Sequence, residues 1–320
     1  MEQILWVGLQ FLFALTKFIS TKMYYRRKLI LALLEISGRP LSSTDLQKYL
    51  FLLANRQKKA AYEFVPYRYG CYSFQLDQDL RTMKKIQLLN SSVVGKKETW
   101  QKQTGENYLP QLKPEDRLAM QGVHNRFKQF TTRQLVHHTY VHYPYYAIKS
   151  RIAARLLAAE DWSRVQAEVP RPQESVLFTI GYEGISLEHY LNRLIKQGVQ
   201  LLCDVRRNSF SMKYGFSKRQ LQHACESVGV QYWHVPALGI VSDKRKSLHS
   251  LADYENLFDE YEQTTLTKET EALQQVADVF ENYQRVALTC FEREVCMCHR
   301  GRVAKHLVAR PGWKIPLIHL

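Results

Sequence analysis

The C-terminal half of the chain alternates apolar, strand-like runs with helical runs, and this alternation limits the folds that it can adopt. The runs fall at residues 176–180 (strand), 187–197 (helix), 199–205 (strand), 217–228 (helix), 230–235 (strand), 254–283 (helical), 285–291 (strand), 299–309 (helix) and 314–319 (strand). Strands joined by helical crossovers lie parallel, with helices on both faces of the sheet. The sequence therefore predicts an α/β domain with a doubly wound, mostly parallel sheet over residues 176–320.

The N-terminal half has a different pattern. A helix begins near Arg26 and stops at the Ser-Gly-Arg-Pro run of residues 37–40, and a capping sequence at 42–45 starts a second helix. A third helix is expected over 75–89, and residues 91–100 alternate and turn as a β-hairpin does. Helices followed by a hairpin is the order of a winged-helix domain. We predict a winged-helix-like, mainly helical domain over 23–105 and a helical segment over 106–170.

Residues 4–19 form an apolar run that is interrupted by Gln10 and Lys17, and we expect residues 1–22 to be an amphipathic helical extension. Glu2 is wrong for the positively charged start of a secretory signal, and the run is short for a membrane span. The six cysteines show no disulfide framework of a secreted domain. We therefore predict a cytoplasmic protein with no membrane partner.

The positive charge of the chain is concentrated in its first half. Of the formal net charge of +15, residues 1–170 carry +13 and residues 171–320 carry +2. A polyanion such as nucleic acid is the natural partner of such a surface, although a basic protein with no such partner is the alternative.

Residues 64–73 read FVPYRYGCYS, and this segment resembles the signature of the Panacea (SocA-like antitoxin) domain family. The resemblance covers about residues 24–105 and implies a winged-helix-like interaction domain, often beside a toxin or defence effector, with a possible protein partner. Asp77 and Asp79 on the third predicted helix argue against base reading in the major groove. We expect instead that Lys96, Lys97 and Lys102 on the hairpin contact the DNA backbone.

Two carboxylates, Asp204 and Glu292, follow apolar strands of the predicted sheet. Ligands bind at the carboxyl ends of strands in open α/β sheets, so both are candidate catalytic residues. A pair of carboxylates, one that stays ionised and one whose pKa is raised by burial, suits hydrolysis at a glycosidic carbon. Alternatively, Asp204 only pairs with Arg206, Arg207 or Arg300 to hold the loops together.

The loop after Asp204 is basic and interleaved with aromatic side chains, which suits phosphate contacts and base stacking. Its candidate DNA-binding residues are Arg206, Arg207, Lys213, Tyr214, Phe216, Lys218 and Arg219. A second basic cluster lies at 244–246. Tyr182 is expected to stack on a base, Arg300 to bind phosphate or carboxylate at a helix N-terminus, and His299 to act as a general acid or a capping contact.

The cysteines allow two other interpretations. Cys290 or Cys203 could be a nucleophile, as in sulfur-transfer enzymes, although Cys203 is expected to be buried. Cys290, Cys296, Cys298 and His299 could bind zinc, but their spacing is not a standard structural pattern. We therefore predict no metal and no cofactor.

Residues 176–320 resemble the bacterial domain-of-unknown-function family four-eight-eight. The motifs that carry the resemblance are Thr179-Ile180-Gly181, Asp204-Val205-Arg206, Phe216-Ser217, Leu238-Gly239, and Cys290-Phe291-Glu292 with Cys298-His299-Arg300. Members look like components of DNA-modification and phage-defence systems, and the resemblance implies action on nucleobases. Ile240-Val241 stands where a further glycine is usual, so that loop is expected to bind a different substrate.

These observations together predict a DNA-acting enzyme, an N-glycosylase that excises a modified base in phage defence. The basic N-terminal half would hold double-stranded DNA, and the α/β domain would accept a flipped base. The alternatives are a non-catalytic nucleic-acid-binding regulator or antitoxin-like module, and a thiol-dependent sulfurtransferase.

Overall fold

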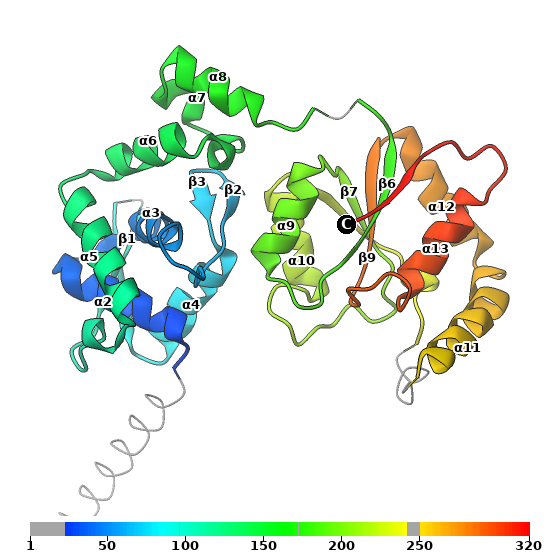
Figure 1. Ribbon diagram of the computed structural model, residues 1–320, viewed down its shortest axis with the longest axis horizontal. Helices are drawn as coiled ribbons and strands as arrows, with labels where there is room; N and C mark the ends of the chain where they lie inside the picture. Colours follow the sequence, from blue (N-terminus) through cyan, green and yellow to red (C-terminus); the bar gives the residue numbers. More distant parts are fainter. Residues whose placement is uncertain (1–22, 96, 172, 242–249) are drawn as a thin grey trace, which may run out of the picture. The chain divides into compact units, whose positions relative to one another are not determined.

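The computed structural model describes residues 23–95, 97–171, 173–241 and 250–320, and the chain divides into two compact units (Figure 1). The first unit comprises Met1–Glu63 and Gln75–His138, and the second comprises Phe64–Phe74 and Thr139–Leu320. The amphipathic helix predicted over 1–22 lies outside the described residues. Within the described ranges, no helix is both long enough and apolar enough to cross a membrane.

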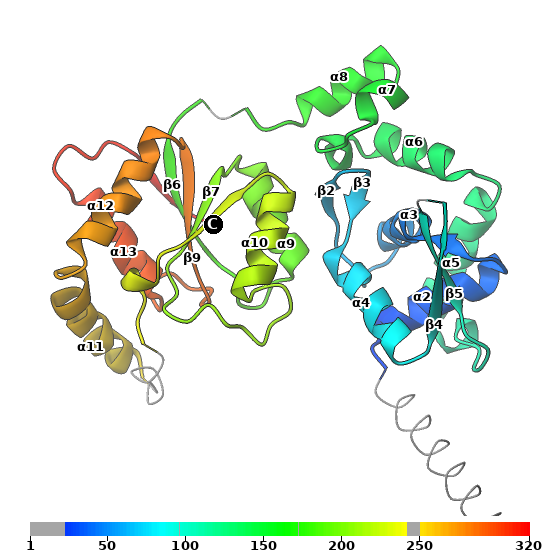
Figure 2. The same cartoon turned by 180° about the vertical axis from the view of Figure 1, so that it is seen from behind.

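The first unit packs helices on a small antiparallel sheet. The helices are α2 (Tyr25–Ser37), α3 (Ser43–Ala54), α4 (Phe74–Lys85), α5 (Pro114–Phe127) and α6 (Thr132–His142). The first residue of α4 and the last turn of α6 belong to the second unit. The sheet has the order β1-β5-β4, from β1 (Leu41–Ser42), β4 (Leu89–Val94) and β5 (Lys97–Lys102). Figure 2 shows the β4–β5 hairpin beside α2 and α3. The predicted order of helices and hairpin is confirmed, and the winged-helix assignment stays a prediction.

Local sequence signals set the limits of these elements. Helix α2 ends at Ser37 because Gly38 adopts a left-handed conformation, with φ of 61°. Helix α3 begins with a capping box in which Ser42 accepts from the Asp45 backbone N–H and Asp45 accepts from that of Ser42. Both signals were expected from the sequence.

Asp79 of α4 faces the interior of the first unit instead of solvent. Its carboxylate accepts from Arg26 Nε at 2.6 Å, Arg27 Nε at 2.7 Å and the Tyr62 hydroxyl at 3.0 Å. The side chain is fully buried. The acidic character that argued against groove reading therefore rests on Asp77, which pairs with Arg81 at the helix surface.

The second unit is built on the predicted parallel sheet. Its strand order is β10-β6-β9-β7-β8, and every neighbouring pair is parallel. The strands are β6 (Val176–Gly181), β7 (Leu201–Asp204), β8 (Gln231–His234), β9 (Arg285–Cys290) and β10 (Leu317–His319). The α/β fold class is confirmed. The last strand begins at Leu317, later than the predicted start at residue 314.

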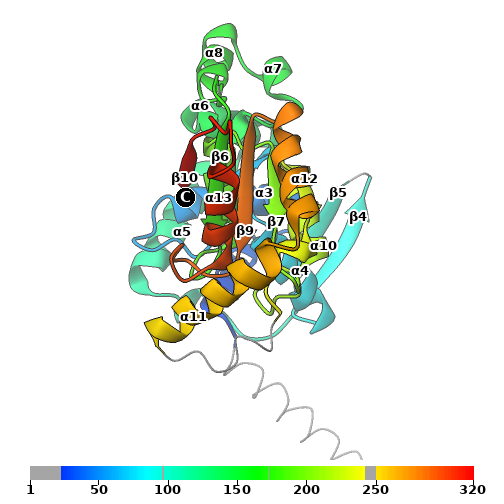
Figure 3. The same cartoon turned by 90° about the vertical axis from the view of Figure 1, so that its right-hand side faces the viewer.

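Helices cover both faces of this sheet (Figures 1 and 3). On one face lie α9 (Leu187–Lys196) and α10 (Lys218–Ser227), which pack against Phe178, Ile180 and Leu202. On the other lie α11 (Leu251–Tyr261), α12 (Thr270–Asp278) and α13 (His299–Val308), which share a core with Leu177, Cys203 and Leu288. The predicted helical stretch 254–283 is thus divided between α11 and α12, with a π-helical turn, Glu262–Leu266, after α11.

The hairpin of β2 (Val65–Tyr67) and β3 (Gly70–Tyr72) belongs to the second unit, although the predicted boundary placed it in the winged-helix-like domain. Asn192 of α9 donates to the Phe64 carbonyl at 2.7 Å, and the Ser73 hydroxyl donates to the Glu188 carboxylate at 3.0 Å. Val65 joins the core under α9. The predicted helical segment 106–170 also divides between the units and adds α7 (Ala153–Leu156) and α8 (Ala159–Ala167) to the second.

Candidate functional site

The carboxyl ends of β6, β7 and β9 meet at one edge of the sheet, where the sequence predicted a site. A pocket of about 350 Å³ opens there. Its lining residues come from the loops after these strands, from the loop after β8 and from the start of α13: Tyr182, Arg206, Arg207, Asn208, Phe210, Ser211, Met212, Ile240, Cys290, Phe291 and His299.

Two glycines allow the loops around the pocket to approach one another closely. A Cβ atom on Gly181 would lie 1.9 Å from the Glu292 carbonyl oxygen, and one on Gly239 would lie 2.0 Å from the Arg207 backbone nitrogen. The first contact fixes the loop after β9 against the end of β6. The Tyr182 and Glu183 backbone N–H groups both donate to the Phe291 carbonyl, at 3.1 and 2.9 Å, which holds the same loop.

Asp204 is fully buried at the end of β7 and forms an ion pair with Arg206. Its Oδ1 accepts from Arg206 Nε at 2.8 Å, and its Oδ2 accepts from Arg206 Nη2 at 2.5 Å and from the Tyr232 hydroxyl at 2.6 Å. Burial alone would lower the pKa of Arg206, but its hydrogen bonds and charge interaction with Asp204 raise it. Burial and the Asp204 charge raise the pKa of Tyr232.

The two predicted carboxylates therefore lie in different environments. Strands β7 and β9 are neighbours, as expected, and Asp204 is paired in register with Thr289. Neither carboxylate is among the lining residues of the pocket. Asp204 is bound to Arg206, which is the bracing role that the sequence left open. Glu292 is half-buried and lies instead beside Cys290. The catalytic role of Asp204 stays a prediction.

The aromatic and basic residues that follow Asp204 divide into internal and surface groups. Tyr182 and Phe216 are buried and stack on each other with ring centroids 4.1 Å apart. The Tyr182 hydroxyl accepts from Arg206 Nη1 at 2.6 Å, and its carbonyl accepts from Lys213 Nζ at 2.6 Å. The Tyr214 hydroxyl donates to the Phe74 carbonyl at 2.9 Å. Tyr182 and Arg206 line the pocket, and Phe216, Lys213 and Tyr214 make internal contacts behind it. The DNA contacts that the sequence assigned to these side chains stay predictions.

The surface group faces solvent near the pocket. Arg207, Lys218 and Arg219 are exposed, as a phosphate-binding role requires. Phe210 and Met212, which both line the pocket, are 72% and 95% exposed. Large apolar side chains left in water beside cationic ones are a surface on which a base can stack.

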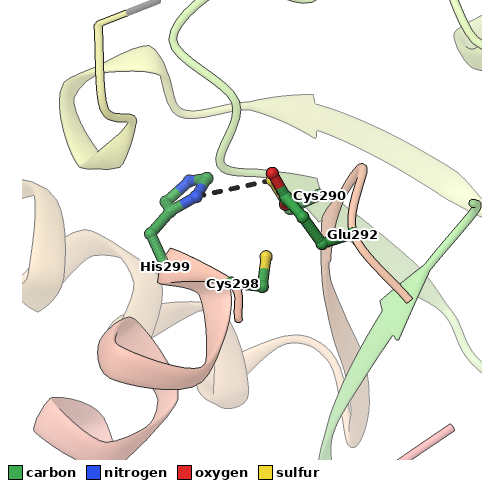
Figure 4. A group of neighbouring side chains, drawn as sticks. All are labelled: Cys290, Glu292, Cys298 and His299. Atoms are coloured by element: carbon green, nitrogen blue, oxygen red, sulfur yellow. Dashed lines mark hydrogen bonds between the residues drawn. The ribbon is translucent and has the colours of Figure 1, made fainter. Parts of the chain in front are cut away.

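A cluster of thiol, imidazole and carboxylate groups lies at the floor of the pocket, which two of its members, Cys290 and His299, line. Figure 4 shows the side chains of this cluster. Cys290 ends β9, Cys298 caps α13 and His299 is the first residue of that helix. Cys290 Sγ lies 3.4 Å from His299 Nδ1 and 3.1 Å from a Glu292 carboxylate oxygen. Burial, the hydrogen bond with Cys290 and the charge of Glu292 raise the pKa of the Cys298 thiol.

His299 has a fixed orientation in this cluster. Its Nε2 lies 2.8 Å from the Val205 carbonyl oxygen, an atom that can only accept. Nε2 therefore carries the proton of the neutral ring and donates it to Val205, and Nδ1 presents its lone pair to Cys290. A carbonyl at the end of β7 thus sets the tautomer of a side chain on α13.

Arg300 has a different role from the predicted phosphate clamp. It is 1% exposed, its Nη1 donates to the Glu292 carbonyl, and its Nη2 donates to the Arg293 carbonyl at 2.8 Å. Because the guanidinium is turned inward, it holds the loop that carries Glu292 and presents no charge to a solvent-side anion.

The remaining predicted basic contacts lie elsewhere or outside the described residues. Lys97 is exposed on β5 of the first unit, whereas Lys102 pairs with Glu35 at 2.9 Å. Their contacts with the DNA backbone stay a prediction. Lys96 and the basic cluster at 244–246 lie outside the described residues.

Sequence reasoning missed the composition of the cluster. It grouped Cys296 with Cys290, Cys298 and His299, but Cys296 is exposed and Glu292 takes the place beside Cys290. It also missed Tyr232 as a partner of Asp204 and Val205 as the acceptor for His299. The available signal was the adjacency of the Cys-Phe-Glu and Cys-His-Arg motifs, which lie only a short loop apart.

The fold and the site together define an open parallel α/β domain with a thiol–imidazole–carboxylate cluster at the carboxyl ends of its strands. Residues 186–307 match the model of a family described as Domain of unknown function DUF488. This match agrees with the resemblance found for the C-terminal half. It does not reach the N-terminal half, where the Panacea resemblance stays a prediction. A search of curated proteins gives no match to the chain.

Proposed function

We propose that the α/β unit hydrolyses an N-glycosidic bond in DNA and excises a base, with Glu292 as the catalytic carboxylate. The observation that carries the proposal is the position of Glu292 beside a pocket that combines a cation, Arg207, with exposed apolar side chains such as Phe210. Arg207 would bind a backbone phosphate, and the apolar side chains would stack on the extruded base.

The proposed chemistry follows from the different environments of Glu292 and Asp204. Glu292 is half-buried beside the pocket, so it can orient a water molecule and stabilise positive charge on the sugar in the transition state. Asp204 acts in this proposal as a positioning residue, because its oxygens hold Arg206 and Tyr232. A modified base in phage DNA is the proposed substrate, and the basic first unit, including Lys97, is the proposed DNA-holding surface.

Base release from defined DNA tests the proposal. Duplexes with plain and modified bases are incubated with the full chain, released bases are identified by mass spectrometry, and abasic sites are revealed by alkaline cleavage. We expect Glu292→Gln to lower turnover by about 10²–10⁴-fold with DNA affinity retained. Glu294→Gln is the matched control, because Glu294 is 68% exposed and only distantly paired with Arg293. Base release by Glu292→Gln at the normal rate would exclude the assignment.

Thiol chemistry is the second candidate, and one distance favours it. The Nδ1 lone pair of His299 lies 3.4 Å from Cys290 Sγ, so the imidazole can accept the thiol proton, as a base does beside a nucleophilic cysteine. A sulfurtransferase would form thiocyanate from thiosulfate and cyanide and lose this activity in Cys290→Ser. Cys290 is only 1% exposed, which favours the first candidate.

A further inference from the structure

The cluster at the floor of the pocket has the composition of a metal site. Ligand atoms of Cys290, Glu292, Cys298 and His299 all lie within 4.8 Å of one another. They come from the end of β9, the loop after it and the first turn of α13, so two rigid elements hold three of them. Figure 4 shows the four side chains gathered at one point.

The spacing suits a small tetrahedral ion. Zn²⁺ binds thiolate at about 2.3 Å and imidazole at about 2.0 Å, which places neighbouring ligand atoms of a tetrahedron about 3.3–3.8 Å apart. Cys290 Sγ and His299 Nδ1 are separated by 3.4 Å. Small rotations of the side chains would therefore bring them onto one ion.

The hydrogen bond of His299 also suits a metal ligand. Metal-binding histidines donate their other ring N–H to a carboxylate, a backbone carbonyl or water, which fixes the ring and leaves a lone pair for the metal. His299 donates Nε2–H to the Val205 carbonyl at 2.8 Å, and Nδ1 faces the cysteines. The orienting contact therefore comes from β7, outside the cluster.

We propose that Cys290, Cys298 and His299 bind one Zn²⁺ ion and that its fourth position faces the pocket beside Glu292. Two thiolates and one imidazole select a borderline-soft ion such as zinc over magnesium or calcium. Cys290 and His299 line the pocket, so an ion that they share is within reach of a bound ligand. Three protein ligands with one open position is the arrangement of catalytic zinc sites.

The role of the ion rests on the function proposed above. Zinc lowers the pKa of a bound water, and Glu292 lies where it can take the proton. The resulting hydroxide would form a bond to C1′ of the sugar, and the bond between C1′ and the base nitrogen would break. The base nitrogen keeps that electron pair and takes the proton from Glu292, so one water is consumed for each base released.

Metal binding is measured directly on the full chain, without reference to activity. The protein is first stripped of metal with a chelator under reducing conditions. Zn²⁺ or Co²⁺ is then added back, and the bound zinc and the Co²⁺ spectrum are measured. We expect one ion per chain and thiolate-to-cobalt absorption of a four-coordinate site. Cys290→Ser, Cys298→Ser and His299→Ala should each weaken zinc binding by more than about 100-fold. Cys296→Ser, the matched control on the same loop, should bind as the parent does, because Cys296 is exposed and outside the cluster.

The measurement on the parent protein keeps the proposal testable if a variant fails to fold. Absence of zinc and cobalt binding by the parent would overturn it, and so would a Cys290–Cys298 disulfide that persists in reducing buffer. Equal loss of zinc by Cys296→Ser and Cys290→Ser would also overturn it. A rise in the melting temperature of the parent on zinc addition, absent in Cys290→Ser, would support it.

Glu292→Gln tests whether the fourth position on the zinc ion is open or is occupied by Glu292. We expect this variant to bind zinc as tightly as the parent but to release base about 10²–10⁴-fold more slowly. Loss of zinc on a par with Cys290→Ser would overturn the open position. The two proposals also fail separately. Zinc binding without base release from any DNA would contradict the proposed function alone. Base release that continues after chelation would contradict the catalytic role of the ion alone.

Discussion

Replacement of Asp204 by Asn tests whether this carboxylate braces the site or takes part in the chemistry. The change keeps the shape of the side chain but removes the charge that faces Arg206. Arg206 is 5% exposed, and it would remain as a buried cation with only the Tyr182 hydroxyl, the Phe216 carbonyl and one amide oxygen as acceptors. The Asn side chain would also direct an N–H group at either the guanidinium or Tyr232.

The cost follows from the burial of the pair. Removing one partner of a buried ion pair typically destabilises a protein by about 3–5 kcal/mol, and the remaining acceptors place this case near about 3 kcal/mol. For a unit of this size, that corresponds to a fall in melting temperature of roughly 6–12 °C. Asp259→Asn is the control. Its side chain is 64% exposed and 3.9 Å from Arg302, so we expect a change below about 0.5 kcal/mol.

A double variant identifies the origin of the loss. Adding Arg206→Gln to Asp204→Asn removes both charges and keeps polar groups at both positions, so we expect it to recover a large part of the stability. Unfolding is followed by circular dichroism and denaturant titration, and DNA affinity and base release are measured on the same samples. An Asp204→Asn variant that melts like the parent but releases no base would refute the bracing argument and restore the catalytic role predicted from the sequence.

Three further outcomes follow from contacts described above. In Gly181→Ala, the new Cβ would lie 1.9 Å from the Glu292 carbonyl oxygen and should displace the loop that carries Glu292. We expect stability to fall by about 1–3 kcal/mol and base release to be lost. Normal activity would show that the close approach is dispensable. Asp79→Asn should destabilise the first unit by about 3 kcal/mol in denaturant titration, whereas Asp77→Asn, in a surface pair, should have almost no effect. Arg207→Gln should weaken binding to all DNA sequences alike and reduce the salt slope by about one, and an unchanged slope in a salt titration would remove Arg207 from the phosphate contacts.

Much of the α/β fold could be predicted from the sequence, because each strand is a short apolar run bounded by turn residues. The alternation with helices then required a parallel sheet, and the neighbouring positions of β7 and β9 brought the ends at Asp204 and Cys290 to one edge. Helix limits set by capping, such as the start of α3 at Ser43, were also readable. These features depend on residues close together in the chain.

The inward-facing charges could not be predicted, since sequence spacing does not determine the depth of a side chain. Arg300 looks like a surface cation at a helix start, but it is buried against the loop after β9, which packs closely on Gly181. The cluster was misjudged for a related reason. Spacing favoured Cys296, but the turn between Glu292 and Cys298 directs that side chain into solvent. Neighbours along the loop were mistaken for neighbours in space.

The hairpin of β2 and β3 has a consequence for the order in which the protein folds during synthesis. Its partners on α9 are made much later: Ser73 and Glu188 are separated by 115 positions, and Phe64 and Asn192 by 128. Until α9 emerges, Val65 and Phe74 have no apolar partner from that helix, and the first unit is completed in the meantime. The second unit must therefore close a loop that contains an entire folded body, a long-range step that we expect to be slow. On a ribosome stalled before residue 187, the β2–β3 hairpin would already be synthesised, but α9, against which it packs, would not.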